Sequence, residues 1–259
     1  MSRRWPDQLW IVRHGQSSGN VMRDHADAAG LAVIDIAERD MDVPLSELGV
    51  RQSHALGKWF AAMPEAMRPN TVIMSPYVRA VQTADGIAGS GGVQASTARH
   101  VDERLREREF GVLDRLTRAG IVERFPEQAE ARARLGKFYH RPPGGESWVD
   151  VILRLRSLLD TISLHHAQPG SRVLIVAHQV VVLCLRYLIE NMTEHEVLTI
   201  DSTDDVANCG VTEYRLRGPH DASAPTEASL ELVTYNFVAP LQDEGTPVTT
   251  QPDAPVAPR

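Results

Sequence analysis

The sequence predicts an α/β protein, a three-layer α/β/α sandwich with a mostly parallel central sheet. Five short runs of apolar and β-branched residues have the length of strands (residues 9–12, 71–74, 173–177, 210–216 and 230–235). Segments with the apolar spacing of helices lie between these runs. Strands that alternate with helices along a chain are typical of a parallel sheet covered on both faces.

Three of the expected helices are marked by their first residues. Ser46 is placed to cap one helix, and Ser147 opens an amphipathic helix with a stripe of Leu and Ile. Ser75-Pro76 predicts a third helix, with proline at its first position. Residues 104–145 read as short charged helices and loops without a strand, so we expect an insertion that covers a site at the sheet edge.

The last part of the chain differs in composition from the rest. From residue 240 onward it is rich in Pro, Thr, Gln and Asp and has almost no large apolar side chains. Such a segment cannot bury enough apolar surface to offset the entropy of ordering it. We therefore expect one domain over residues 1–240 and a disordered Pro-rich tail over residues 241–259.

Overall composition excludes several classes of function. The 259 residues carry a formal net charge of −7, which argues against nonspecific binding of nucleic acid. The most apolar stretch, residues 173–189, is interrupted by His178, Gln179 and Arg186, so no membrane span is expected. No signal peptide is visible, and two cysteines cannot build a disulfide framework. We expect a cytoplasmic protein without nucleic-acid or membrane partners, whose oligomeric state stays open, with a homodimer as one option.

The most informative segment is Arg13-His14-Gly15, directly after the first predicted strand. In open α/β sheets, ligands bind beyond the carboxyl ends of the strands. Gly15 allows a sharp turn and a close approach to an anion, and Arg13 offers a planar fork of donors that suits phosphate. His14 is close to neutral at pH 7, so one ring nitrogen is free to attack phosphorus. The alternative is a structural histidine at a strand end, with its hydrogen bonds satisfied.

Two further strands also end in chemically useful residues. Arg79 falls in the first turn of the helix after residues 71–74, and a helix N-terminus with a guanidinium group favours an anion. The alternative for Arg79 is an exposed surface position. His178 directly follows residues 173–177, and histidines at the ends of two parallel strands can lie side by side. The alternative for His178 is a core position, bonded to a backbone carbonyl.

A charged cluster at residues 105–111 supplies candidates for a proton donor. A carboxylate near a phosphate site is costly when it is ionised, which favours the protonated form. On spacing alone either Glu107 or Glu109 could serve, and the alternative is a solvated charge cluster.

Together these segments resemble the histidine phosphatase superfamily, also called the phosphoglycerate mutase-like family, from about residue 9 to residue 241. Arg13-His14-Gly15 matches its signature, and Leu105-Arg106-Glu107 matches the block that holds its acid, which selects Glu107 over Glu109. Further matches are Ser17, Asn20, residues 42–52, Arg79, residues 144–147, Arg154 and Ala177-His178.

The resemblance implies a mechanism and a set of site residues. His14 is expected to attack phosphorus and form a phosphohistidine, while Arg13, Arg79 and His178 hold the phosphate oxygens. Glu107 is expected to protonate the leaving group and then to help activate water. Further phosphate-binding residues are expected to be Ser17, Asn20 and Gln179. No cofactor or metal is implied, and the ten histidines show no zinc-type spacing.

The same residues could support hydrolysis or a mutase reaction. Cofactor-dependent phosphoglycerate mutases usually have Gly-Asn-Ser after the second histidine, where this chain has Gln179-Val180-Val181. They also usually carry Trp where this chain has Gly19. The His-Gln pair is more similar to the fructose-2,6-bisphosphatase branch. We therefore expect a phosphatase acting on a small phosphorylated substrate. The first alternative is a mutase, and the second alternative is an inactive relative that acts as a binding module.

Residues 137–143, within the insertion, allow two interpretations. These residues mix cationic and aromatic side chains, similar to a stretch in plant and fungal mutase-like proteins. They are expected either to line the substrate mouth or to form a packed loop before the last amphipathic helix.

Overall fold

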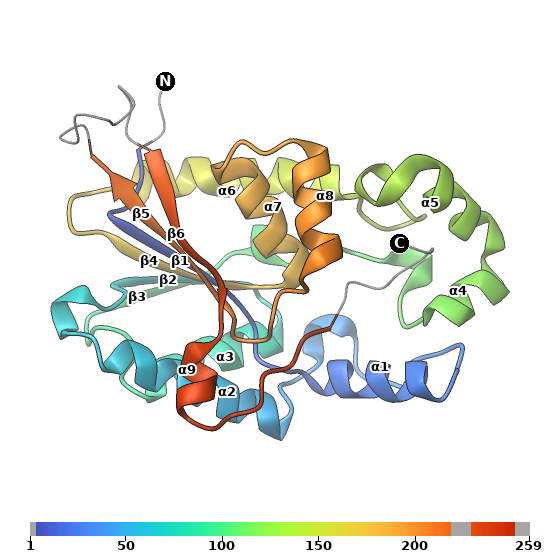
Figure 1. Cartoon of the computed structure of the whole chain (residues 1–259), viewed down its shortest axis with the longest axis horizontal. Helices are drawn as coiled ribbons and strands as arrows, with labels where there is room; N and C mark the ends of the chain where they lie inside the picture. The colour runs from blue at the N-terminus through green and yellow to red at the C-terminus, as the bar shows by residue number, and fades with distance from the viewer. Residues whose placement is uncertain (1–3, 219–228, 252–259) are drawn as a thin grey trace.

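A six-stranded sheet forms the centre of the molecule (Figure 1), in a computed structural model that describes residues 4–218 and 229–251. The strand order is β3-β2-β4-β1-β5-β6. Strands β3, β2, β4 and β1 are parallel, and β5 runs antiparallel to both β1 and β6, which confirms a mostly parallel sheet. The strands are β1 Gln8–Arg13, β2 Thr71–Met74, β3 Ala98–Val101, β4 Arg172–Ala177, β5 Val211–Arg217 and β6 Ser229–Phe237.

Helices cover both faces of the sheet, as the alternation of side chains along β1 requires. Leu9 and Ile11 belong to a core shared with α6 and α7, whereas Trp10 and Val12 pack with α2 and α3 on the opposite face. This arrangement confirms the predicted three-layer sandwich. The helices are α1 Ser18–Ala28, α2 Glu47–Ala61, α3 Val78–Gly89, α4 Arg118–Arg124, α5 Pro126–Tyr139, α6 Trp148–His165, α7 Gln179–Ile189, α8 Glu194–Thr203 and α9 Ala239–Asp243.

The register between β1 and β4 places the two predicted histidines at one edge of the sheet. Arg13 pairs with Ala177, and the backbone N–H of His14 donates to the Ala177 carbonyl at 2.9 Å. His14 and His178 are therefore the first residues beyond two adjacent parallel strands. The predicted side-by-side placement is correct.

The predicted insertion forms a wall beyond these strand ends. Within residues 104–145 the structure has short 3-10 turns, α4 and α5, and no strand. The backbone N–H of Ile34 donates to the Arg115 carbonyl at 2.8 Å, and Val33 forms a β-bridge with Leu116. The insertion and the loop of residues 30–43 are thus joined, and Figure 1 shows α4 and α5 at the same end of the sheet as α1.

Two local features differ from the sequence predictions. The edge strand β3 was not predicted, because its four residues are all exposed and lack the apolar pattern of a buried strand. Helix α3 begins at Val78 with Tyr77 as its N-cap, and not at Ser75-Pro76. Ser75 is recruited elsewhere, because its hydroxyl lies 2.8 Å from Nε2 of His178.

The expectation of a disordered tail from residue 241 is wrong for residues 241–251. Leu241 is fully buried in the short helix α9. Beyond it, the side-chain amide of Gln52 donates to the Pro247 carbonyl and to Oγ1 of Thr249, both at 2.9 Å. Polar side chains and backbone groups anchor this segment, and such contacts cannot be predicted from the content of apolar residues. Residues 252–259 of the expected tail lie outside the described residues.

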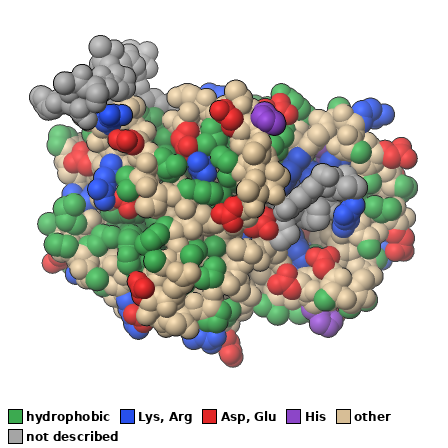
Figure 2. Space-filling model, in the orientation of Figure 1, with side chains coloured by type: hydrophobic (Ala, Val, Ile, Leu, Met, Phe, Trp, Pro, Cys, Tyr) green, Lys and Arg blue, Asp and Glu red, His purple; other side chains and the backbone are tan. Residues whose placement is uncertain are grey.

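The surface carries no large single-sign patch on the face shown in Figure 2, where described acidic and basic side chains are interspersed. Within the described parts of the chain, none of the helices has the length and apolar character needed to cross a lipid bilayer.

Candidate active site

His14 is held in one tautomer by its two ring contacts. Nδ1 lies 2.7 Å from the carbonyl oxygen of Gly15, which can only accept a hydrogen bond, so Nδ1 carries the hydrogen. Nε2 accepts a hydrogen bond from Nε of Arg79 at 3.2 Å and therefore holds a lone pair. Burial, and next the Arg79 and Arg13 cations, lower the pKa of His14 well below its usual value. A neutral imidazole with its Nε2 lone pair in a cationic pocket is suited to attack an electrophile.

Gly15 is required for close packing of the backbone, whereas the sequence suggests a sharp turn and a close approach to an anion. Its φ is not positive, but a Cβ atom on it would lie 2.6 Å from the carbonyl oxygen of Gly49. A Cβ atom on Gly49 would in turn lie 2.0 Å from the Gln16 carbonyl oxygen. The two glycines let the loop after β1 pack directly on the first turn of α2. The Gly15 N–H donates to Oγ1 of Thr83, which fixes the loop further.

His178 lies beside His14, with a distance of 5.1 Å between the ring centroids. Burial, followed by the charge of Arg79, lowers the pKa of His178 well below its usual value, so the ring is neutral. Its Nε2 lies 2.8 Å from Oγ of Ser75, and Oγ accepts from the backbone N–H of Tyr77. The Ser75 hydroxyl is thus free to donate to Nε2, which leaves the proton on Nδ1. Among the described residues Nδ1 has no hydrogen-bond partner, but the ring is fully buried and lies behind the pocket lining, which does not include His178.

Replacing Ser75 by alanine is expected to lower kcat/KM for a phosphate monoester about tenfold, the usual effect of losing one hydrogen bond to a positioned group. The variant would leave the tautomer of His178 unspecified and weaken its donation from Nδ1. The measurement is steady-state hydrolysis together with inhibition by orthovanadate, which should weaken in parallel. Ser53→Ala serves as the matched control, because this serine is also buried but its hydroxyl bonds to Val50 within α2. Equal kinetics for Ser75→Ala and the wild type would contradict the assignment.

Arg13 and Arg79 bring two buried guanidinium groups to the pocket. Arg13 donates from Nη1 to the Val206 carbonyl at 2.5 Å, and burial lowers its pKa to about 10, so it stays cationic at neutral pH. Arg79, in the first turn of α3 as predicted, contacts His14 through Nε and Asp40 through its two terminal nitrogens. The pocket is therefore built to receive negative charge.

Glu107 and Glu109 occupy different environments. Glu107 lines the pocket, and its Oε2 lies 4.0 Å from Nδ1 of His178. Its Oε1 accepts from the backbone N–H of Arg108. The Glu109 side chain is exposed and accepts from the Tyr77 hydroxyl at 3.2 Å, outside the pocket lining. The structure thus places Glu107, and not Glu109, beside the histidine pair.

A partly buried ion pair supports the backbone on which Glu107 sits. Arg154 of α6 donates from Nε and Nη2 to the carboxylate of Glu146, both at 3.0 Å. Its remaining donors reach the backbone carbonyls of Arg104 at 2.5 Å and Glu107 at 3.3 Å. The block at residues 144–147 and Arg154, matched in the sequence, therefore position the segment with the acid.

Three other predicted phosphate-binding residues line the pocket at helix N-termini. Ser17 and Asn20 form a capping box on α1, in which each side chain accepts from the backbone N–H of the other. Both residues therefore stabilise the helix as well as lining the pocket. Gln179 is the first residue of α7, and its Nε2 has no hydrogen-bond partner among the described residues.

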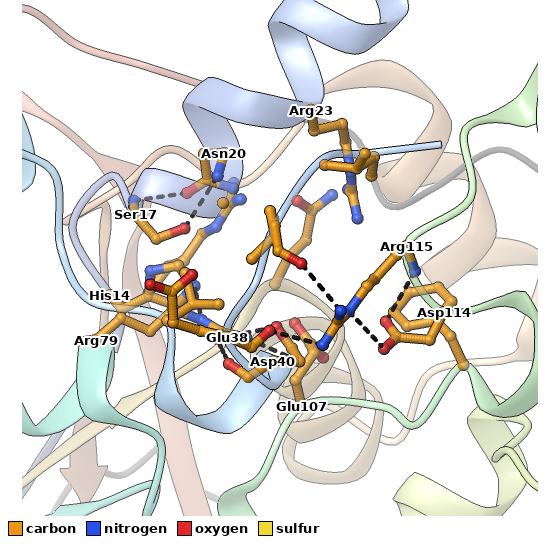
Figure 3. A pocket seen from close by; sticks show the side chains of 17 residues that line it. His14, Ser17, Asn20, Arg23, Glu38, Asp40, Arg79, Glu107, Asp114 and Arg115 are labelled. Atoms are coloured by element: carbon orange, nitrogen blue, oxygen red, sulfur yellow. Dashed lines mark hydrogen bonds and ion pairs between the residues drawn. The ribbon is translucent and has the colours of Figure 1, made fainter. Parts of the chain in front are cut away.

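Several charged residues at the mouth of the pocket, shown in Figure 3, are not among those predicted from the sequence. Arg23 extends from α1, Glu38 and Asp40 come from the loop of residues 30–43, and Asp114 and Arg115 come from the insertion. Arg115 adopts φ 57° and donates to the carbonyls of Ile36 and Glu38. No motif marks these residues, because they reach the pocket only when the loop and the insertion pack together.

Residues 137–143 form a packed segment and contribute no side chain to the pocket lining. Phe138 is buried against Trp148 and Tyr187, and the ammonium group of Lys137 binds the carboxylate of Asp201. The segment is thus packed before α6, as the second interpretation expects, but residues 137–139 form the end of α5 and only residues 140–143 are a loop. Within the described residues there is no group of three or more His, Cys, Asp or Glu side chains placed to hold a metal ion.

Comparison with known proteins gives a family match over most of the chain. Residues 9–222 match the histidine phosphatase superfamily, branch 1. The chain is 31% identical over 180 residues to a 6-phosphofructo-2-kinase/fructose-2,6-bisphosphatase of Caenorhabditis elegans, which covers 70% of this chain and 33% of that protein. It thus spans about a third of the length of this relative. It is 29% identical to a 2,3-bisphosphoglycerate-dependent phosphoglycerate mutase of Sinorhizobium fredii, over 74% of this chain and 84% of that one.

Solved structures show the same fold. A mycobacterial hydrolase superimposes with a TM-score of 0.66 and 25% identity, over 90% of this chain and 99% of the other. A mycobacterial glucosyl-3-phosphoglycerate phosphatase superimposes with a TM-score of 0.63 and 23% identity, over 89% of this chain and 99% of the other.

Proposed function

This chain belongs to the histidine phosphatase superfamily, and on that premise we propose that it hydrolyses a phosphate monoester of a small metabolite through a phosphohistidine on His14. The observation that carries the proposal is the state of the His14 ring. Its Nε2 lone pair points into a pocket with two buried guanidinium groups, while Nδ1 is held by the Gly15 carbonyl. This arrangement suits nucleophilic attack on a phosphoryl group.

The proposed reaction has two steps, each a displacement at phosphorus. In the first, Nε2 of His14 forms a bond to phosphorus, the bond to the ester oxygen breaks, and Glu107 gives its proton to the leaving oxygen. In the second, the Glu107 carboxylate takes a proton from a water molecule whose oxygen attacks the phosphohistidine. The phosphorus–nitrogen bond breaks, and inorganic phosphate and the free imidazole are released.

The surrounding side chains supply charge and position. Arg13 and Arg79 neutralise the phosphate oxygens, and Nδ1–H of His178 donates to one of them. The three helix-end residues Ser17, Asn20 and Gln179 line the same pocket and complete the proposed phosphate site. All of these groups belong to the protein, so the proposal assigns the reaction no metal ion or cofactor.

A mutase reaction is the second candidate, because relatives of this chain are named phosphoglycerate mutases. A mutase must keep water from the phosphohistidine, whereas a phosphatase admits it. Gln179 favours hydrolysis, because its amide lies at the pocket with Nε2 unbonded among the described residues and can hold a water molecule. Relatives named as fructose-2,6-bisphosphatases also favour hydrolysis.

The test is product analysis with 3-phosphoglycerate and a panel of phosphorylated metabolites. We expect free phosphate to accumulate with at least one monoester, while 3-phosphoglycerate is not converted to 2-phosphoglycerate. Formation of 2-phosphoglycerate without release of phosphate would establish the mutase instead. A folded protein that binds these compounds but turns none of them over would establish the binding module.

A further inference from the structure

The donors of Arg79 that would hold a phosphate group are bound to a carboxylate of the chain itself. Nη1 lies 3.0 Å from Oδ1 of Asp40, and Nη2 donates to Oδ2 at 3.2 Å. Nη1 also donates to the Asp40 backbone carbonyl at 2.5 Å, and Nε is directed at His14. Figure 3 shows Asp40 beside Arg79 and His14, within the pocket. All three nitrogens of this guanidinium group are therefore occupied.

The two partners differ strongly in how much water reaches them. The Arg79 side chain is 6% exposed, whereas the Asp40 side chain is 42% exposed. A buried guanidinium group needs a counter-charge, so Arg79 cannot remain in the pocket unpaired without a large desolvation cost. Asp40 can turn into solvent at little cost, because it is already half hydrated. Of the two groups, Asp40 is the one that can leave.

We propose that Asp40 is an internal competitor for the phosphate group. It neutralises Arg79 while the site is empty, gives way when the phosphate group of a substrate binds, and returns as inorganic phosphate leaves. The idea rests on the proposed function, because it takes phosphate as the ligand of Arg79. Two anions on one guanidinium group in a low-dielectric pocket repel each other, so carboxylate and phosphate occupy Arg79 in turn.

This exchange would favour release of the product. Displacing Asp40 costs the same free energy for inorganic phosphate and for a monoester, so it lowers both affinities by the same factor. A monoester keeps its further contacts with the mouth of the pocket and still binds, whereas inorganic phosphate has no such contacts and leaves readily. Asp40 is therefore a residue that promotes product release, and not one that takes part in bond breaking.

The chain offers two matched controls for Asp40. Asp42 lies in the same 3-10 turn and is equally exposed at 40%, but it bonds to Nε of Arg39 at 2.7 Å. Asp114 lines the same pocket and carries the same charge, but its carboxylate accepts from the backbone N–H of Arg115. The first control tests the charge of the turn, and the second tests the general negative charge of the pocket.

The experiment measures the affinity of inorganic phosphate for the intact protein by calorimetry at constant ionic strength. Asp40→Asn keeps the shape of the side chain and the backbone contact to Arg79 but removes the charge. We expect it to bind phosphate roughly 5–30-fold more tightly, the range for losing one competing charged hydrogen-bond pair. Asp42→Asn should change the affinity less than twofold, and Asp114→Asn should change it clearly less than Asp40→Asn.

Unchanged or weaker phosphate binding by Asp40→Asn would overturn the inference, and so would equal tightening by Asp40→Asn and Asp114→Asn. The readout is binding and needs no turnover. If the wild type binds phosphate but hydrolyses no ester, the proposed function fails. The comparison of phosphate affinity between the wild type and Asp40→Asn still tests whether Asp40 competes with phosphate. If neither wild type nor Asp40→Asn binds phosphate, the inference fails directly. Thermal unfolding of each variant verifies that the exposed substitutions leave the fold intact.

Discussion

His14→Ala is expected to abolish hydrolysis of phosphate monoesters. The substitution removes the only side chain that the proposed mechanism uses as a nucleophile, and alanine offers no lone pair for phosphorus. The residual pocket would still carry the cations of Arg13 and Arg79, so substrate binding should survive. The measurement is release of inorganic phosphate from an aryl phosphate, because such a substrate needs the least help from a proton donor.

The matched control is His54→Ala, which removes an exposed histidine of α2 bonded to Ser90. This control should keep wild-type turnover. Rapid quenching in alkali should also trap a phosphoryl group on the wild type, and this acid-labile label should be absent from His14→Ala. Undiminished turnover by His14→Ala would remove this residue from the mechanism.

The central part of the site could be predicted because it depends on short segments at strand ends. A buried strand that ends at Arg13 and another that ends before His178 are visible in the sequence, and parallel pairing brings their ends together. The helix at Ser147 was predicted from its cap and its apolar stripe, and the structure shows both, including a capping box with Asp150. Local patterns sufficed for these elements because local interactions define them.

The remainder of the site depends on contacts between distant segments, which no local pattern encodes. Asp40 reaches Arg79 across 39 residues, and Ser75 reaches His178 across 103. Ser75-Pro76 predicts the start of a helix, because a serine before proline is a good local signal, but the contact of Ser75 with His178 is invisible in the sequence.

The C-terminal segment shows the same limit. Gln251 is buried beside α1, where its side-chain amide donates to the Asn20 carbonyl at 2.8 Å and to the Asp24 carboxylate at 2.6 Å. The Nδ2 group of Asn20 donates back to it. A Pro- and Thr-rich composition predicts disorder because it lacks apolar side chains, but here hydrogen bonds across more than 200 residues hold the chain.

Glu107→Gln is expected to lower kcat on alkyl phosphates by roughly 10²–10⁴-fold, the usual contribution of a positioned general acid. Glutamine keeps the size of the side chain and can still contact the Arg108 N–H, but it has no proton to give to an alkoxide. An aryl phosphate has a leaving group that departs without a proton, so the decrease in kcat on this substrate should be much smaller. The ratio of the two losses, measured on one preparation, therefore reports proton donation and not damage to the fold.

Glu109→Gln gives the matched control, because it makes the same chemical change two residues away on an exposed side chain that bonds to Tyr77. We expect it to alter both rates by less than about threefold, the effect of an exposed contact. Equal losses on alkyl and aryl phosphates in Glu107→Gln would point to a structural role. A larger loss in Glu109→Gln than in Glu107→Gln would reverse the assignment of the acid, which rests on the family resemblance of residues 105–107 and on the position of Glu107 beside His178.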